Sequence, residues 1–250
     1  MFALTRIKCS HASKSIPIYS SAILCKVYGG KDLQCYKDSS DNIAVRNGRL
    51  HITARPDYSN GKYSSGRIRQ KTAPFAYGAY VARMKLPKGK HLWPAFWLLL
   101  QNNNCMYEEL DIVEYRGQET SKAEFAAHLG RNYSHLVSKG LSREMNKDLS
   151  ADFHEYALLW IPRKLKWYID GQLMHEQNTS WNYWTSKAPQ NKKPCRYMDP
   201  LFQNPQPIIF NMAVGGGFFP PNQYPPLKFE EAQNWPQPSL EVDWVRIYQG

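Results

Sequence analysis

The chain has 250 residues, which suits one all-β sandwich domain as well as two smaller domains and is enough to bury a sizeable core. Its formal net charge is +11, which permits affinity for an anionic surface, but the basic residues are scattered and no nucleic-acid-binding motif is visible, so no nucleic-acid partner is expected. The longest apolar run, residues 92–100, is too short to cross a membrane, so no transmembrane segment is expected.

The N-terminal residues 1–27 form an uncertain segment. Lys8, Lys14 and Lys26 interrupt its apolar stretches, so no clean signal peptide is visible. The segment is either a degenerate leader or an atypical first strand. Residues 28–250 contain no internal repeat and no linker, and we expect them to form one domain.

From residue 28 onward, short alternating runs are separated by turn residues. Residues 80–86 alternate with apolar side chains at even positions, and residues 153–161 are apolar on both faces, as in a central strand. Residues 165–169 and 240–248 are further strands. The turn signals are Asn47-Gly48, Asn60-Gly61, Lys88-Gly89 and Asp170-Gly171. No long stretch has a helical period, so the pattern predicts an all-β sandwich.

Aromatic residues and cysteines add two observations. Aromatics make up 14% of the chain, with 8 Trp and 16 Tyr, which suits contact with sugar rings but also an aromatic-rich core. The five cysteines form no CxxC pair and no metal-ligand spacing, and their odd number leaves at least one thiol free. The cysteines therefore constrain the redox compartment poorly.

The densest acidic stretch is ELDIVE at residues 109–114. Alternate side chains of a β-strand share a face, so Glu109 and Asp111 lie together while Glu114 points away. One β-bulge between Asp111 and Glu114 would turn Glu114 back, because a bulge sets two residues of one strand against one of its partner. We therefore predict three carboxyls on one face of one strand.

Three neighbouring carboxyls favour acid–base chemistry. Like charges at short range raise one another's pKa, so at least one carboxyl can stay protonated near neutral pH. A glycosidase needs that combination, with one ionised carboxylate to attack and one protonated carboxyl to donate. The alternative is a half-exposed strand in which acidic and apolar residues alternate without a catalytic role.

Nine sequence blocks occur in an order that resembles one enzyme family. The blocks are YSSGRI at 63–68, YG at 77–78, KLPKG at 85–89, LWPAFW at 92–97, ELDIVE at 109–114, FHEY at 153–156, WYIDG at 167–171, NMAVGG at 211–216 and VDWVR at 242–246. Over roughly residues 28–249 the chain resembles glycoside hydrolase family 16, in its branch of endo-β-1,3-glucanases (laminarinases).

The resemblance implies a fold and a mechanism. The fold is a β-jelly-roll of two curved antiparallel sheets, with a sugar-binding cleft on the concave face, and residues 28–250 would be the catalytic domain. Glu109 would be the nucleophile and Glu114 the acid/base, with Asp111 between them tuning both. The reaction implied is hydrolysis of β-1,3-glucan by a retaining, double-displacement mechanism.

The chain departs from the family pattern in three places. The usual first strand is not recognisable before Tyr28. Family members commonly have Gly before the nucleophile, where this chain has Glu108, and many laminarinases carry a Trp a few residues earlier, where it has Asn104-Cys105-Met106-Tyr107. We expect the last two differences to touch the substrate cleft, which leaves the preferred polysaccharide open.

The candidates for contact with sugar are Arg67, Trp93, Trp97, Tyr107, His128, Trp181, Trp184 and Asn211. Trp93 and Trp97 would share a strand face, which suits stacking on sugar rings, although both could equally belong to the core. An inward-facing Arg67 needs a partner, either a sugar, the catalytic carboxylates or a structural ion pair.

The other candidates rest on position and on the resemblance. His128 follows the acidic strand, and the resemblance places it on the leaving-group side of the cleft. Asn211 interrupts an apolar run, so a backbone group or a sugar hydroxyl must satisfy it. Trp181 and Trp184 lie in the expected loop 178–204, where exposed aromatics favour binding. A second long loop is expected at 218–238.

The resemblance requires no cofactor, although Asp243 matches a position that helps to bind a structural calcium in many relatives. It also implies an extracellular protein with a polysaccharide substrate, and we expect a monomer. Other functions stay open: a transglycosylase of the same fold, a hydrolase of agar, carrageenan or mixed-linkage glucan, or a non-catalytic β-glucan recognition protein. The last has lost the catalytic glutamates, whereas Glu109 and Glu114 are present here.

Overall fold

The computed structural model describes residues 3–8, 18–20, 32–58, 62–71, 73–102 and 105–249. Within the segment 1–27, the described parts are the two strands β1 (Ala3–Lys8) and β2 (Ile18–Ser20), and its other residues lie outside the described part of the chain. None of the helices in the described residues is long and apolar enough to cross a membrane.

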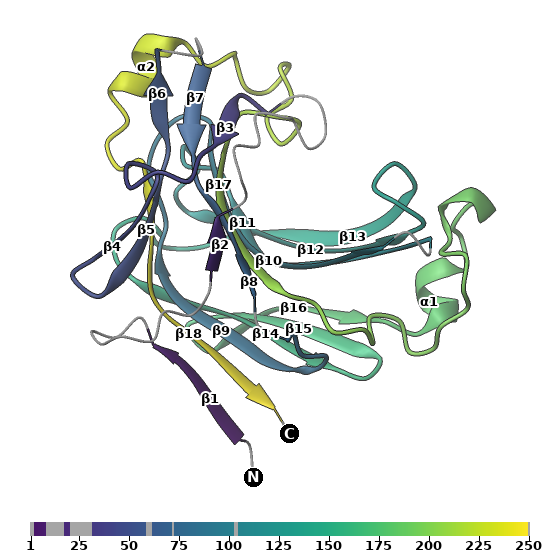
Figure 1. Ribbon diagram of the computed structural model, residues 1–250. Helices are drawn as coiled ribbons and strands as arrows, with labels where there is room; N and C mark the ends of the chain where they lie inside the picture. The colour runs from purple at the N-terminus through teal and green to yellow at the C-terminus, as the bar shows by residue number, and fades with distance from the viewer. Residues whose placement is uncertain are drawn as a thin grey trace.

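Two large antiparallel sheets form the body of the protein (Figure 1). The eight-stranded sheet has the order β16 (Gln172–Asn178), β15 (Lys164–Ile169), β14 (His154–Ile161), β9 (Gly78–Lys85), β18 (Ser239–Gln249), β5 (Arg49–Thr53) and β4 (Ile43–Arg46), with β1 also paired to β18. The seven-stranded sheet has the order β13 (Leu136–Glu144), β12 (Lys122–Gly130), β11 (Met106–Tyr115), β10 (Leu92–Asn102), β17 (Ile208–Val214), β8 (Arg67–Gln70) and β2.

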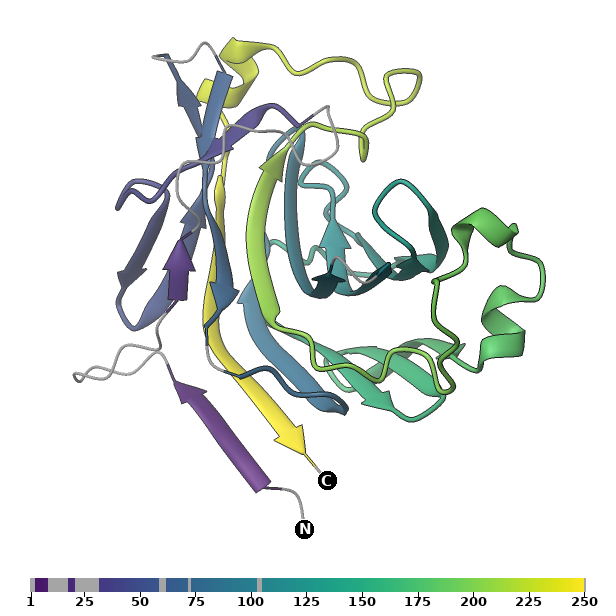
Figure 2. The same cartoon turned by 45° about the vertical axis from the view of Figure 1, so that its right-hand side comes forward.

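Smaller elements lie at the ends of this sandwich. A three-stranded sheet is formed by β3 (Gln34–Tyr36), β7 (Lys62–Ser65) and β6 (Arg55–Asp57), and the short helix α2 (Phe229–Gln233) lies beside it. The helix α1 (Trp181–Thr185) lies at the other side, beyond the β12–β13 hairpin (Figure 1). Figure 2 shows that β10 and β17 bend strongly along their length, so the seven-stranded sheet has a concave face. The predicted all-β jelly-roll sandwich is confirmed.

The hydrophobic core lies between the two sheets. The alternation predicted for residues 80–86 is confirmed, because Tyr80, Ala82 and Met84 are all fully buried on β9. From the facing sheet, Phe96 and Leu110 enter the same core. Burying one large apolar side chain contributes roughly 1.5–3 kcal/mol to stability. These alternating positions therefore hold the two sheets against each other.

Two of the predicted turns are tight hairpins. Asn47 and Gly48 have φ of 50° and 75°, and Asp170 and Gly171 have φ of 49° and 75°. Two consecutive residues with positive φ are the requirement of the hairpin turn that Asn-Gly and Asp-Gly favour. The turn at Asn60-Gly61 lies outside the described residues. Lys88-Gly89 instead belongs to the connection that carries the chain from β9 in one sheet to β10 in the other.

Two expectations about chain segments need correction. The strand β14 is central in its sheet, but it buries only alternate residues, and Ile161 at its end is 37% exposed. The outer face of β14 is turned to solvent and is not covered by another sheet or helix layer of the described residues. The expected loops 178–204 and 218–238 contain the five-residue helices α1 and α2.

Candidate active site

The predicted bulge in the acidic strand is present. On β11, Asp111 pairs with Ala126 and Glu114 pairs with Glu124, so two residues of β11 stand opposite Phe125 alone. The extra residue returns Glu114 to the face that carries Glu109 and Asp111. The bulge is also held from the opposite sheet, since Nε1 of Trp167 donates a hydrogen bond of 2.8 Å to the backbone oxygen of Asp111.

All three carboxyls line one cleft on the concave face of the seven-stranded sheet. The cavity volume is about 290 Å³. Its other lining residues include Asp32, Tyr36, Arg67, Trp93, Trp97, Tyr107, Tyr133 and Asn211. Alternate residues of β10 line the cleft, and Trp93 and Trp97 are two of them, so they share a face as predicted. Neither is a core residue.

Each of the three carboxyls has its own hydrogen-bonding or charged partner. The hydroxyl of Tyr107 donates to Glu109, and Nε1 of Trp93 donates to Oε1 of Glu114 over 2.9 Å. Nε2 of His128 lies 2.9 Å from Oδ2 of Asp111, close enough for an ion pair when the ring is protonated, although its N–H is not aligned for a hydrogen bond. The three carboxyls therefore differ in their surroundings: a tyrosine hydroxyl contacts Glu109, an indole N–H contacts Glu114, and an imidazole lies beside Asp111.

Burial is the main cause of the raised pKa values in the cluster. It raises the pKa of Glu109 to about 8, with a further contribution from the charge of Asp111, and that of Asp111 to about 7. The pKa of Glu114 is raised well above its ordinary value by burial and then by the charges of Asp111 and Glu109. The cluster therefore shares protons near neutral pH, so that one carboxyl can hold a proton for general acid catalysis while another is ionised.

Comparison with known proteins identifies the family. The sequence profile of glycosyl hydrolases family 16 matches residues 30–199. The chain belongs to that family. It is therefore a glycoside hydrolase.

Individual relatives of this family 16 chain carry glucanase names. It is 34% identical over 234 residues to a glucan endo-1,3-beta-glucosidase of Cryptopygus antarcticus, covering 89% of this chain and 83% of the relative. It is 29% identical over 236 residues to glucan endo-1,3-beta-glucosidase A1 of Niallia circulans, covering 88% of this chain but only 33% of that longer protein. The crystal structure of the laminarinase catalytic domain from Thermotoga maritima MSB8 superposes with a TM-score of 0.77 at 27% identity, covering 100% of this chain and 98% of that one.

The family 16 cleft also contains Arg67 and Asn211, as lining residues with partners inside the protein. The guanidinium of Arg67 lies 4.7 Å from the ring centroid of Trp97. Nε1 of Trp97 donates to Oδ1 of Asn211 over 2.7 Å, and Nδ2 of Asn211 donates to the hydroxyl of Tyr36 over 3.2 Å. This chain of contacts fixes the floor of the cleft beside the carboxyls.

Several residues of the cleft were not predicted from the sequence. Asp32 and Tyr36 come from the segment at β3, and Tyr133 comes from the β12–β13 turn. Phe218 is not itself a lining residue, but it stacks on the lining residue Trp93 with ring centroids 4.5 Å apart. These residues come from segments far apart in the sequence, and their local patterns carried no signal for the site.

The two other predicted tryptophans do not line this cleft. Trp184 is only 2% exposed and packs edge-on against Phe202, with ring centroids 5.1 Å apart. Trp181 is half-buried against Tyr197. The expectation of two exposed loop aromatics was wrong, because the segment folds into α1 and turns Trp184 into the protein.

Glu108 was also expected near the substrate, and this was wrong. It is fully buried on the face of β11 opposite to Glu109, where it accepts hydrogen bonds from Nδ2 of Asn204 over 3.1 Å and Nε2 of Gln206 over 3.2 Å. Strand alternation sends residue 108 into the core when residue 109 faces the cleft. Its carboxyl anchors the chain that leads into β17.

A pH-dependent stability follows from Glu108. Burial raises its pKa from 4.5 to about 7, so between these values the folded state keeps a proton that the unfolded state has lost. The free energy of unfolding should therefore fall as pH rises from 4.5 to about 7, by about 3 kcal/mol from this group. Glu108→Gln should flatten the pH dependence by that amount. Urea unfolding of both proteins at pH 5 and pH 8 measures the difference, and parallel pH dependences would contradict it.

Two places among the described residues concern metal binding. Arg83 lies 2.7 Å and Arg49 3.9 Å from the carboxylate of Asp243. Calcium prefers a shell of six to eight oxygens, so the two cations around Asp243 do not fit a calcium site. Glu109, Asp111 and His128 bring ligand atoms within 4.8 Å of one another, but these residues belong to the carboxyl cluster itself.

Proposed function

We propose that this family 16 protein is a secreted endo-β-1,3-glucanase that cleaves its polysaccharide with retention of anomeric configuration. The observation that carries the proposal is the bulge in β11, which sets Glu109 and Glu114 on one face of one strand. The names of the relatives from Cryptopygus antarcticus and Niallia circulans support the substrate. We further propose that the protein acts as a monomer.

Glu109 is the nucleophile in the first step. Its carboxylate attacks the anomeric carbon, and the bond to the leaving oxygen breaks while Glu114 gives that oxygen a proton. Because Nε1 of Trp93 donates to Oε1 of Glu114, the transferable proton sits on Oε2. The product of this step is a glycosyl ester on Glu109 and a shortened chain with a free hydroxyl.

Glu114 becomes the base in the second step. Esterification removes the charge of Glu109, which had helped to raise the pKa of Glu114. Glu114 then accepts a proton from water, and the water oxygen attacks the anomeric carbon and releases Glu109 as a carboxylate. Asp111 lies between the two glutamates, and its charge raises the pKa of both.

Trp93 and Trp97 offer flat apolar surfaces along β10, on which sugar rings can stack. Arg67 lies against Trp97 and can donate to sugar hydroxyls. His128 faces Asp111 and a second hollow of the surface that also includes Glu114. We assign it to the leaving-group side of the cleft.

The substrate is tested with a reducing-sugar assay on laminarin, lichenan, agarose and κ-carrageenan. Laminarin should be cleaved fastest, with oligosaccharides of several lengths as early products, as endo action requires. Faster cleavage of agarose or κ-carrageenan would overturn the β-1,3-glucan assignment and leave the family unchanged.

Tyr107→Phe should impair the nucleophile rather than substrate binding. The hydroxyl of Tyr107 donates to Glu109 and lowers its pKa against the effect of burial. Without this bond, ionised Glu109 is less stable, so the acidic limb of the kcat/KM profile should move to higher pH. A hydrogen bond to a charged group contributes roughly 1.5–3 kcal/mol, which is a loss of about 10- to 100-fold in kcat below the new pKa.

Tyr133→Phe is the matched control for Tyr107→Phe. Tyr133 lines the same cleft and meets Tyr107 edge-on with ring centroids 6.2 Å apart, but it is 57% exposed. Its variant should leave the acidic limb in place. If Tyr107→Phe raises KM alone and keeps the pH profile, Tyr107 contacts the sugar and does not act on Glu109.

A further inference from the structure

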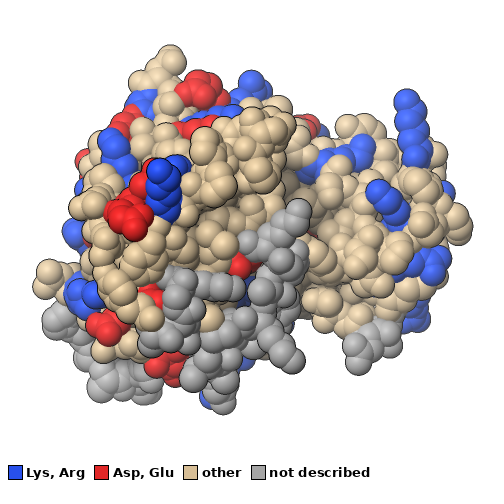
Figure 3. All heavy atoms as spheres, turned by 90° about the horizontal axis from the view of Figure 1, so that it is seen from above, with Lys and Arg blue, Asp and Glu red and all other residues tan. Residues whose placement is uncertain are grey.

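The segment that carries α1 is strongly basic. Residues 181–198 contain Lys187, Lys192, Lys193 and Arg196 and no acidic residue. The next acid, Asp199, is already paired with Arg163 over 2.8 Å. In Figure 3 the lobe on the right, which holds this segment, displays Lys and Arg side chains and almost no acid.

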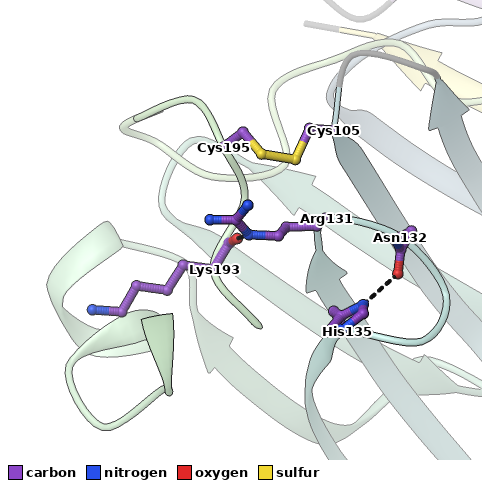
Figure 4. Close-up of a disulfide and its surroundings, with 6 residues drawn as sticks. All are labelled: Cys105, Arg131, Asn132, His135, Lys193 and Cys195. Atoms are coloured by element: carbon purple, nitrogen blue, oxygen red, sulfur yellow. Dashed lines mark hydrogen bonds between the residues drawn. A yellow bond between two sulfur atoms is a disulfide. The ribbon is translucent and has the colours of Figure 1, made fainter. Parts of the chain in front are cut away.

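Two further cations join this segment from the β12–β13 hairpin. Nε of Arg131 donates to the backbone oxygen of Lys193 over 3.0 Å, and Figure 4 shows the Lys193 side chain extending away from that contact. Nζ of Lys139 lies 4.5 Å from the ring centroid of Tyr183. We call this surface the basic lobe, defined by Arg131, Lys139, Lys187, Lys192, Lys193 and Arg196. Among the described residues, no carboxylate forms an ion pair with these six.

The basic lobe is fixed at one end of the substrate cleft. The disulfide between Cys105 and Cys195 ties it to the residue just before β11, the strand of the catalytic carboxyls (Figure 4). Tyr133, two residues beyond Arg131, lines the cleft. A chain bound to the lobe would therefore lie beside the end of the cleft that Tyr133 lines.

Exposed aromatic rings accompany the charges. Tyr183 is 51% exposed and Tyr197 is 69% exposed. Rings beside cations suit a chain of sugars that carry carboxylate or sulfate groups, because the ring contacts the sugar face and the cation meets the anion. A single exposed ion pair contributes little to binding, but the contributions of several ion pairs along one polysaccharide chain add together. Salt screens these ion pairs and weakens the binding.

We propose that the basic lobe binds anionic polysaccharide. It holds the enzyme beside acidic chains while the cleft works on neutral glucan. The proposal depends on the proposed function in one respect: it takes the polymer near the cleft to be a polysaccharide. Binding to the lobe is measured without turnover.

The test is affinity electrophoresis of the full chain in native gels that contain polygalacturonate. The lobe variant is Lys187→Gln/Lys192→Gln/Arg196→Gln. The control variant is Arg46→Gln/Arg55→Gln/Arg69→Gln, which removes three exposed charges from β4, β6 and β8 and has the same net charge. The lobe variant should bind about tenfold more weakly and the control less than about twofold, with both effects shrinking at high salt. Hydrolysis of laminarin oligosaccharides should be unchanged in both, which also shows that both are folded.

Equal weakening in the two variants would overturn the proposal, since net charge alone would then explain binding. Failure of the unaltered protein to bind polygalacturonate at low salt would overturn it as well. Tighter binding to polyuridylate RNA, lost in the lobe variant, would make nucleic acid the partner instead. If the lobe variant loses polygalacturonate binding but the enzyme does not cleave laminarin, the proposed function fails while the surface assignment stands.

Discussion

Glu109→Gln is expected to abolish hydrolysis of laminarin while the protein stays folded. The amide keeps the shape of the side chain and can still accept the hydrogen bond from Tyr107, but it cannot attack the anomeric carbon. Loss of a catalytic nucleophile costs roughly 10⁴- to 10⁶-fold in kcat. Initial rates on laminarin measure the loss, and calorimetry with laminarin oligosaccharides should show that binding is retained.

Glu108→Gln is the matched control for Glu109→Gln. It makes the same chemical change one residue earlier on β11, on the face that points into the core. It should alter the pH dependence of stability and leave kcat within a few-fold of the unaltered enzyme. Wild-type turnover by folded Glu109→Gln would show that the acidic strand is only a half-exposed strand.

Glu114→Ala is expected to separate substrates by their leaving groups. General acid catalysis contributes roughly 10²- to 10⁴-fold, most of which is needed only by a poor leaving group. An aryl β-glycoside with an acidic phenol should therefore still glycosylate Glu109, whereas laminarin should not react. The second step then stalls, because no base activates water.

Azide tests that assignment directly. It needs no general base, so it should restore turnover of Glu114→Ala on the aryl glycoside and give a β-glycosyl azide, which NMR identifies. Glu109→Ala should give no β-azide, because it cannot form the ester intermediate. If Glu109→Ala gives the β-azide, or if Glu114→Ala loses aryl glycoside and laminarin equally, the two roles are assigned wrongly.

The acidic strand could be predicted because its information is local. Alternation places Glu109 and Asp111 on one face, and a single bulge before Glu114 adds the third carboxyl to that face, as β11 has it. The same two-residue period placed Trp93 and Trp97 together. It also shows that Glu108 faces the core, a consequence of strand alternation that the comparison with the family pattern overlooked.

The rest of the cleft depends on contacts between distant segments. Tyr36 reaches Asn211 across 175 residues of sequence, and Trp167 reaches the bulge at Asp111 from the opposite sheet. Trp184 is buried because a loop folds into a short helix against the sandwich. Periodicity describes which face of a strand a residue occupies, but not which loop will close over that face.

The most direct test of the account is the anomeric configuration of the first products from laminarin. Proton NMR spectra recorded within the first minutes of hydrolysis, before mutarotation, should show new reducing ends in the β-configuration. That result requires both cleavage of β-1,3-glucan and two displacements through Glu109. New reducing ends in the α-configuration would contradict the account, because they would mean a single displacement by water.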